Sequence, residues 1–80
     1  MPKYVPPELQ HRILEILAEG PVESRAGFAT AMLADYAGMH VVGAYGNRLT
    51  WMACRELERA GLVRRDVRGG RTYRIEKVER

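Results

Sequence analysis

The chain has 80 residues, of which 46% are hydrophobic and 29% are charged, and its formal net charge is +3. This length allows one small domain, close to the lower limit at which chains fold without disulfides or a bound metal. Cys54 is the only cysteine, which excludes a disulfide within the chain and suits a reducing compartment such as the cytoplasm. There is no signal-peptide pattern and no run of the roughly 18 apolar residues that a membrane span needs. We therefore expect one soluble, cytoplasmic domain, residues 1–80.

The charge is distributed unevenly along the chain. Residues 1–40 contain three basic and five acidic side chains, whereas residues 41–80 contain ten basic and five acidic ones. All but one of those ten are arginine, whose planar guanidinium suits phosphate and guanine. A basic second half of this kind indicates a polyanionic partner.

The first half of the chain predicts two helices. Residues 1–6 contain two prolines and no periodicity, which is typical of an extended arm. Pro7 suits a first helical position, and Gly20 marks the end of a helix predicted over residues 7–19. An apolar stripe at helical spacing supports this helix and consists of Leu9, Ile13, Ile16 and Leu17.

A second helix is predicted over residues 26–37. Residues 22–27 read as a connection, in which Ser24 is a candidate N-cap. Gly38 closes the helix. Its apolar stripe consists of Ala29, Met32, Leu33, Tyr36 and Ala37.

Residues 39–46 (MHVVGAYG) contain two glycines and two valines, which disfavour a regular helix. One interpretation is a longer turn that places Val41 and Val42 in the core. The other is a mobile loop that presents His40 and Tyr45 beside the next helix. The residues alone do not decide between the two.

The third predicted helix covers residues 47–60, although it could begin as early as Ala44. Asn47 is a good N-cap and Gly61 suits the C-terminal stop. At about 100° per residue, one face is small and apolar and comprises Leu49, Thr50, Ala53, Cys54, Leu57 and Ala60. The opposite face comprises Arg48, Trp51, Met52, Arg55 and Arg59. A solvated helix face normally has mixed charge and no large aromatics, so this composition indicates contact with a partner.

The remaining residues predict a β-hairpin. Residues 62–67 and 72–75 have β-rich patterns, and the paired glycines Gly69 and Gly70 suit a tight turn over residues 68–71. Within the second strand, Tyr73 and Ile75 are predicted to face the core. Residues 77–80 read as a charged tail.

Three stretches resemble the winged helix-turn-helix family, and together they cover roughly residues 8–76. LADYAG (33–38) is similar to the second-helix pattern of that family. RELERAGLVRR (55–65) resembles the end of a recognition helix that enters the first wing strand, and GGRTYRI (69–75) resembles the wing tip and its return strand. The resemblance implies an α+β fold, a small three-helix winged-helix domain with a C-terminal β-hairpin wing. One departure is that Gly38 to Gly61 is about a turn and a half of helix longer than the typical spacing.

The resemblance also implies a DNA-binding site. It makes Arg48, Leu49, Trp51 and Met52, with Arg55 one turn on, the exposed residues of a recognition helix in the major groove. It puts Arg68 and Arg71 of the wing on the phosphates. The loop interpretation adds His40 and Tyr45 to the site. Trp51 points outward on the predicted helix, and its partner is either DNA or a second subunit.

The predicted function is therefore sequence-specific binding of double-stranded DNA by a small transcriptional regulator, such as a repressor. Binding as a homodimer to a palindromic site is expected, and in a bacterium the protein would lie at the nucleoid. No membrane contact, cofactor, metal site or small-molecule ligand is expected. The chain also has no glycine-rich phosphate loop, cysteine–histidine cluster or nucleophile with a plausible base, so an enzyme is not predicted.

Two other functions remain open at this level. The first is a winged-helix module for protein–protein interaction without DNA binding, in which Trp51 and Met52 would anchor the interface. The second is recognition of structured RNA.

Overall fold

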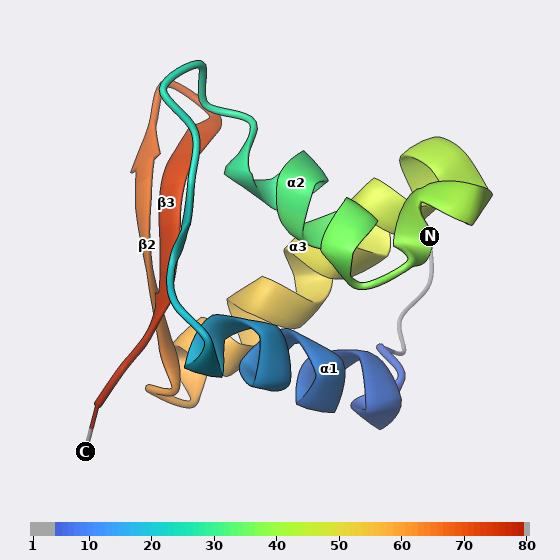
Figure 1. The fold of residues 1–80 in the computed structure, drawn as a ribbon, viewed down its shortest axis with the longest axis horizontal. Helices are drawn as coiled ribbons and strands as arrows, with labels where there is room; N and C mark the ends of the chain where they lie inside the picture. The colour runs from blue at the N-terminus through green and yellow to red at the C-terminus, as the bar shows by residue number, and fades with distance from the viewer. Residues whose placement is uncertain (1–4, 80) are drawn as a thin grey trace.

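The computed structural model describes residues 5–79, except for the side chains of residues 40 and 41 (Figure 1). The described part is a small α+β fold with three α-helices, one 3-10 helix and a three-stranded antiparallel sheet. The helices lie together on one side of the sheet (Figure 1). In chain order the elements are α1 (Pro7–Ala18), β1 (Val22–Glu23), α2 (Ala29–Tyr36), η1 (Met39–Val42), α3 (Gly43–Arg59), β2 (Val63–Arg68) and β3 (Arg71–Lys77).

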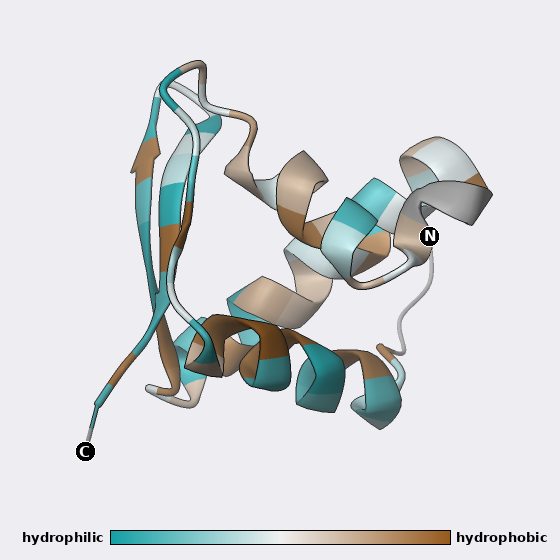
Figure 2. Ribbon diagram, viewed as in Figure 1, coloured by the Kyte–Doolittle hydropathy of each residue, from teal (hydrophilic) through white to brown (hydrophobic). Residues whose placement is uncertain are grey.

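Helix α1 matches the helix predicted over residues 7–19 to within one residue. Pro7 is its first residue, where a missing backbone N–H costs nothing. Leu9, Ile13 and Leu17 are buried, and Ile16 packs partly buried against the core. Figure 2 shows the hydrophobic residues of α1 on the side that faces the other helices. Residues 1–4 of the predicted arm lie outside the described residues.

The predicted order of three helices followed by a hairpin is wrong, because a short strand lies between α1 and α2. Strand β1 pairs antiparallel with β3, with Val22 opposite Ile75 and Glu23 opposite Arg74. The sheet order is β1-β3-β2. Sequence patterns predicted a connection here because two residues are too few to show the alternation of a strand. Val22 is buried and adds one apolar side chain to the core.

The hairpin turn is confirmed, since Gly69 and Gly70 have φ values of +56° and +76°. The predicted faces of β3 are partly wrong. Asp66 pairs with Arg74 and Val67 pairs with Thr72, so Tyr73 is an extra residue on β3. This β-bulge resets the alternation. As a result Thr72 is buried together with Ile75, and Tyr73 is only half-buried.

The end of β3 extends beyond the predicted strand. Lys77 belongs to β3, where it pairs with Val63, so the charged tail does not begin at residue 77. The backbone N–H of Val78 donates to the carbonyl of Leu62 at 2.9 Å and prolongs this pairing.

Helix α2 begins at Ala29, three residues later than predicted. Gly27 has a φ of +86°, which is not helical, and an added Cβ there would lie 2.6 Å from the Cβ of Arg71. Ser24 is not the N-cap residue, but its hydroxyl accepts the backbone N–H of Phe28 at 2.9 Å. This turn brings the start of α2 against the start of β3.

Residues 39–46 form neither a longer turn with both valines in the core nor an irregular loop. They fold as η1 followed by the first turn of α3, so Asn47 lies one turn inside the helix and is not its N-cap. Val42 is exposed, and the side chain of Val41 lies outside the described residues. Gly46 permits this path because a Cβ there would lie 2.0 Å from the carbonyl oxygen of Met39.

The predicted core face of α3 is confirmed with one exception. Leu49, Ala53 and Leu57 are buried, together with Thr50 and Cys54. Ala60 is exposed because the helix ends at Arg59, and Gly61, with a φ of +75°, follows as predicted. Desolvation by burial raises the pKa of the Cys54 thiol to about 12, which keeps it protonated and unreactive.

Because η1 packs against Gly46 of α3, we expect Gly46→Ala to destabilise the protein, which is the opposite of its usual effect in a helix. Alanine normally stabilises a helix interior by about 0.5–1 kcal/mol relative to glycine. Here the added methyl meets backbone, so we expect a loss of about 1–3 kcal/mol in the free energy of unfolding. Chemical denaturation measures the difference, and a more stable variant would contradict the path of residues 39–46.

Candidate nucleic-acid interface

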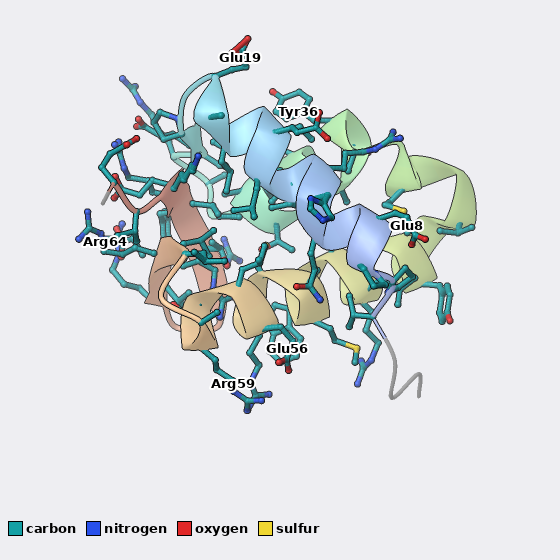
Figure 3. The ribbon with its side chains drawn as sticks, turned by 90° about the horizontal axis from the view of Figure 1, so that it is seen from below. Glu8, Glu19, Tyr36, Glu56, Arg59 and Arg64 are labelled. Carbon is teal, nitrogen blue, oxygen red and sulfur yellow. The ribbon has the colours of Figure 1, made fainter. Side chains whose placement is uncertain are left out.

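The solvent face of α3 carries the side chains that helical periodicity placed there, but Leu49, which the resemblance also made an exposed residue, is buried. Arg48 and Arg55 are exposed, Trp51 is 40% exposed and Met52 is half-buried. Because Trp51 keeps this much accessible surface, it is not a core residue. Figure 3 shows Arg59, from the end of the same face, projecting from α3 away from α1 and α2. The predicted direction of this face is therefore confirmed.

Arg55 and Trp51 lie one turn apart on α3 and contact each other. The guanidinium carbon of Arg55 lies 5.4 Å from the centroid of the Trp51 ring. At this distance the cation is attracted to the ring face.

Several other arginines are engaged by carboxylates of the chain itself. Arg59 pairs with Glu56 at 3.2 Å, between exposed side chains. Arg65 on β2 pairs with Glu58 on α3 at 2.9 Å, and its side chain is only 8% exposed. Arg65 is thus too buried to reach a partner molecule, and Arg59 has the carboxylate of Glu56 beside it. Within residues 5–79, Arg48 and Arg55 form no ion pair, so their charges face solvent without compensation.

The wing residues Arg68 and Arg71 pair with each other across the hairpin turn. The preceding pair, Val67 and Thr72, includes a buried Thr72, so the two arginines project from the opposite face of the sheet. Arg68 lies over the ring of Tyr73 at 4.0 Å and pairs with Asp66 at 3.3 Å.

Arg71 is held at the junction between the wing and α2. Its Nη1 donates to the carbonyl of Ala26 at 3.3 Å, and its guanidinium carbon lies 5.9 Å from the ring centroid of Phe28. No carboxylate within the described residues pairs with it. Its charge is therefore available to a partner.

The first turn of α2 joins the wing to the solvent face of α3. Phe28 forms a β-bridge to Thr72 at the wing and directly precedes α2, whose start lies beside the wing (Figure 1). Two residues further on, Thr30 lines a shallow hollow together with Asn47, Arg48 and Trp51. Helix α2 thus contacts both α3 and β3, and among the described residues no direct contact links the two groups of predicted residues.

The two remaining predicted residues lie near the start of α3. Tyr45 is exposed in the first turn of the helix. The side chain of His40, on η1, lies outside the described residues. The prediction for His40 therefore stays a prediction.

Sequence patterns did not single out Phe28, Tyr73 and Thr30, which lie beside the predicted site residues Arg71, Arg68 and Arg48, respectively. Tyr73 was predicted to lie in the core because the bulge was not foreseen. The sequence placed Phe28 inside the second predicted helix. The available signal was an aromatic residue directly after Gly27. Thr30 carried no signal of its own.

Other kinds of site find no support in the part of the chain described. No group of three histidine, cysteine or acidic side chains there is suited to hold a metal ion. Among its helices, none has the length and apolar character needed to cross a membrane. Comparison of the chain with protein-family models, curated proteins and solved structures gave no match.

The ion pair between Arg65 and Glu58 predicts a stability difference between two glutamates on α3. Glu58→Ala leaves the buried guanidinium of Arg65 without its carboxylate, so we expect a loss of about 3 kcal/mol in the free energy of unfolding. Glu56→Ala removes only an exposed pair with Arg59 and should cost under about 0.5 kcal/mol. Urea denaturation of both variants measures this, and equal losses would contradict the assigned burial.

Proposed function

We propose that this protein is a winged helix-turn-helix regulator that binds double-stranded DNA, with α3 in the major groove and the β2–β3 wing on the phosphate backbone. The observation that carries the proposal is the division of the arginines. Arg48, Arg55 and Arg71 are exposed and have no carboxylate partner among the described residues, whereas the nearby Arg59 and Arg65 are paired. Guanidiniums without a carboxylate partner attract a polyanion.

The dimensions of α3 support entry into a major groove. Its 17 residues span roughly 25 Å, and the major groove of B-DNA, about 12 Å wide, admits an α-helix. Arg48 and Arg55 lie two turns apart and one helical face presents both, so each can donate to guanine O6 and N7 or to phosphate. The apolar surface of Trp51 and Met52 between them suits contact with deoxyribose or a thymine methyl group.

The expected biological role is transcriptional regulation, including repression, by occupying a DNA site. One small domain reads a short sequence, and two copies related by two-fold symmetry would read a palindrome with more affinity. We propose a homodimer on DNA for this reason.

A protein-interaction module is the alternative that a specific observation favours. Trp51 is 40% exposed, and it lines a shallow hollow with Met52 and Arg55. An exposed tryptophan beside a methionine can anchor a protein partner. This alternative predicts no binding to duplex DNA, while recognition of structured RNA predicts that RNA competes better than DNA.

Arginine substitutions on α3 test the proposal. Arg48→Ala with Arg55→Ala should weaken binding to a random-sequence duplex by about 10-fold or more, because each arginine that neutralises a phosphate releases a condensed counterion. Arg59→Ala is the matched control and should change affinity much less, since Arg59 lies in the last turn of α3, at the end away from Arg48. Fluorescence anisotropy at low salt gives the dissociation constants, with duplex RNA as competitor.

Two results would contradict the proposal. One is the absence of duplex binding by the unaltered protein at low salt. The other is equal weakening by Arg59→Ala and by the double substitution.

A further inference from the structure

Every arginine–aromatic stack in the described part of the chain involves an arginine of the proposed interface. The distances from guanidinium carbon to ring centroid are 5.4 Å for Arg55 and Trp51, 4.0 Å for Arg68 and Tyr73, and 5.9 Å for Arg71 and Phe28. The arginines that pair with carboxylates inside the chain, apart from Arg68, have no such stack: Arg59, Arg64, Arg65 and Arg74. The arginines that contact aromatic rings are thus Arg55, Arg68 and Arg71, all of which belong to the proposed interface.

We propose that Phe28 and Tyr73 are positioning residues that hold the wing arginines Arg71 and Arg68 in the orientation that binds DNA phosphates. This inference rests on the proposed DNA-binding function and assigns the wing its ligand chemistry, the sugar-phosphate backbone. Neither aromatic residue itself needs to contact DNA. Trp51 has the same geometric relation to Arg55 on α3.

The physical basis is the loss of side-chain freedom on binding. A long arginine side chain loses rotamer entropy when a contact with DNA immobilises it. An aromatic ring that already holds the guanidinium by its face removes part of that loss beforehand. A guanidinium has five N–H groups, so one that is held over a ring still has N–H groups free to donate to phosphate oxygens.

Local structure supports this role for Phe28. Phe28 is 57% exposed, so the hydrophobic core does not explain its presence. The positive φ of Gly27 and its close approach to Arg71 bring this part of the chain against the start of β3. A β-bridge between Phe28 and Thr72 fixes the position further. The ring is therefore held beside Arg71 by backbone geometry.

Local structure supports Tyr73 in a different way. It is the extra residue of the β-bulge, which leaves it without a partner on β2 and outside the core. Arg68 lies over its ring on the outer face of the wing. The ion pair of Arg68 with Asp66 joins two exposed side chains. Such pairs are weak in water, so a phosphate can replace Asp66 while the ring still holds the guanidinium.

A double-mutant cycle for each pair tests the inference. Tyr73→Leu and Phe28→Leu should each weaken binding to a random duplex by about 2- to 10-fold. They should also reduce the magnitude of the salt dependence toward that of Arg68→Ala and Arg71→Ala, each of which removes about one phosphate contact. Once the arginine is absent, the leucine substitution should have no further effect. Tyr73→Phe and Phe28→Tyr keep the rings and should bind like the unaltered protein.

The affinities of the single and double variants distinguish a positioning role of the rings from a purely structural role. Binding by the unaltered protein tests the proposed function separately. A ring that only stabilises the fold would weaken binding equally with and without its arginine, and such additivity would overturn the inference. Unchanged affinity of both leucine variants would overturn it as well. If the unaltered protein does not bind duplex DNA at low salt, the proposed function falls and this inference falls with it.

Discussion

The burial of one face of α3 is the interaction on which the rest of the structure depends. This face packs against α1, α2 and β2, and its central residues are the small Ala53 and Cys54, which are fully buried. Small side chains let the neighbouring elements approach closely, so α3 forms the centre of the core. The orientation of its opposite face is thereby fixed. Glu58 on that helix also pairs with the buried Arg65 of β2, which links the helix to the first strand of the wing.

Which arginines have a carboxylate partner depends on where the chain places its aspartates and glutamates. Those on α3 and the sheet pair with Arg59, Arg64, Arg65 and Arg74, and Asp66 pairs with the wing residue Arg68. The arginines at the start and middle of α3 keep their full charge and, in one case, an aromatic support. The formal net charge of the whole chain is only +3. Concentration rather than total charge determines the local attraction for a polyanion.

Sequence patterns predicted those elements that depend on local chemistry and periodicity. The stripe of Leu9, Ile13 and Leu17 gave α1, and Gly69 with Gly70 gave the hairpin turn, because each signal is complete within a few residues. The faces of α3 followed from helical geometry, which located Arg48 and Arg55 correctly. Sequence did not reveal features that arise from contacts distant in the chain. These are the pairing of Val22 with β3, the bulge at Tyr73 and the contact of η1 with Gly46.

The central claim is that the solvent face of α3 contacts duplex DNA, and Trp51 offers a direct measurement of it. Trp51 is the only tryptophan, so intrinsic tryptophan fluorescence reports on this face alone. Titration of the protein with a random-sequence duplex at low salt should change that fluorescence in a saturable manner. Added salt should reverse the change, because ions recondense on the phosphates. A fluorescence signal that stays constant while duplex DNA is added to excess would contradict the account.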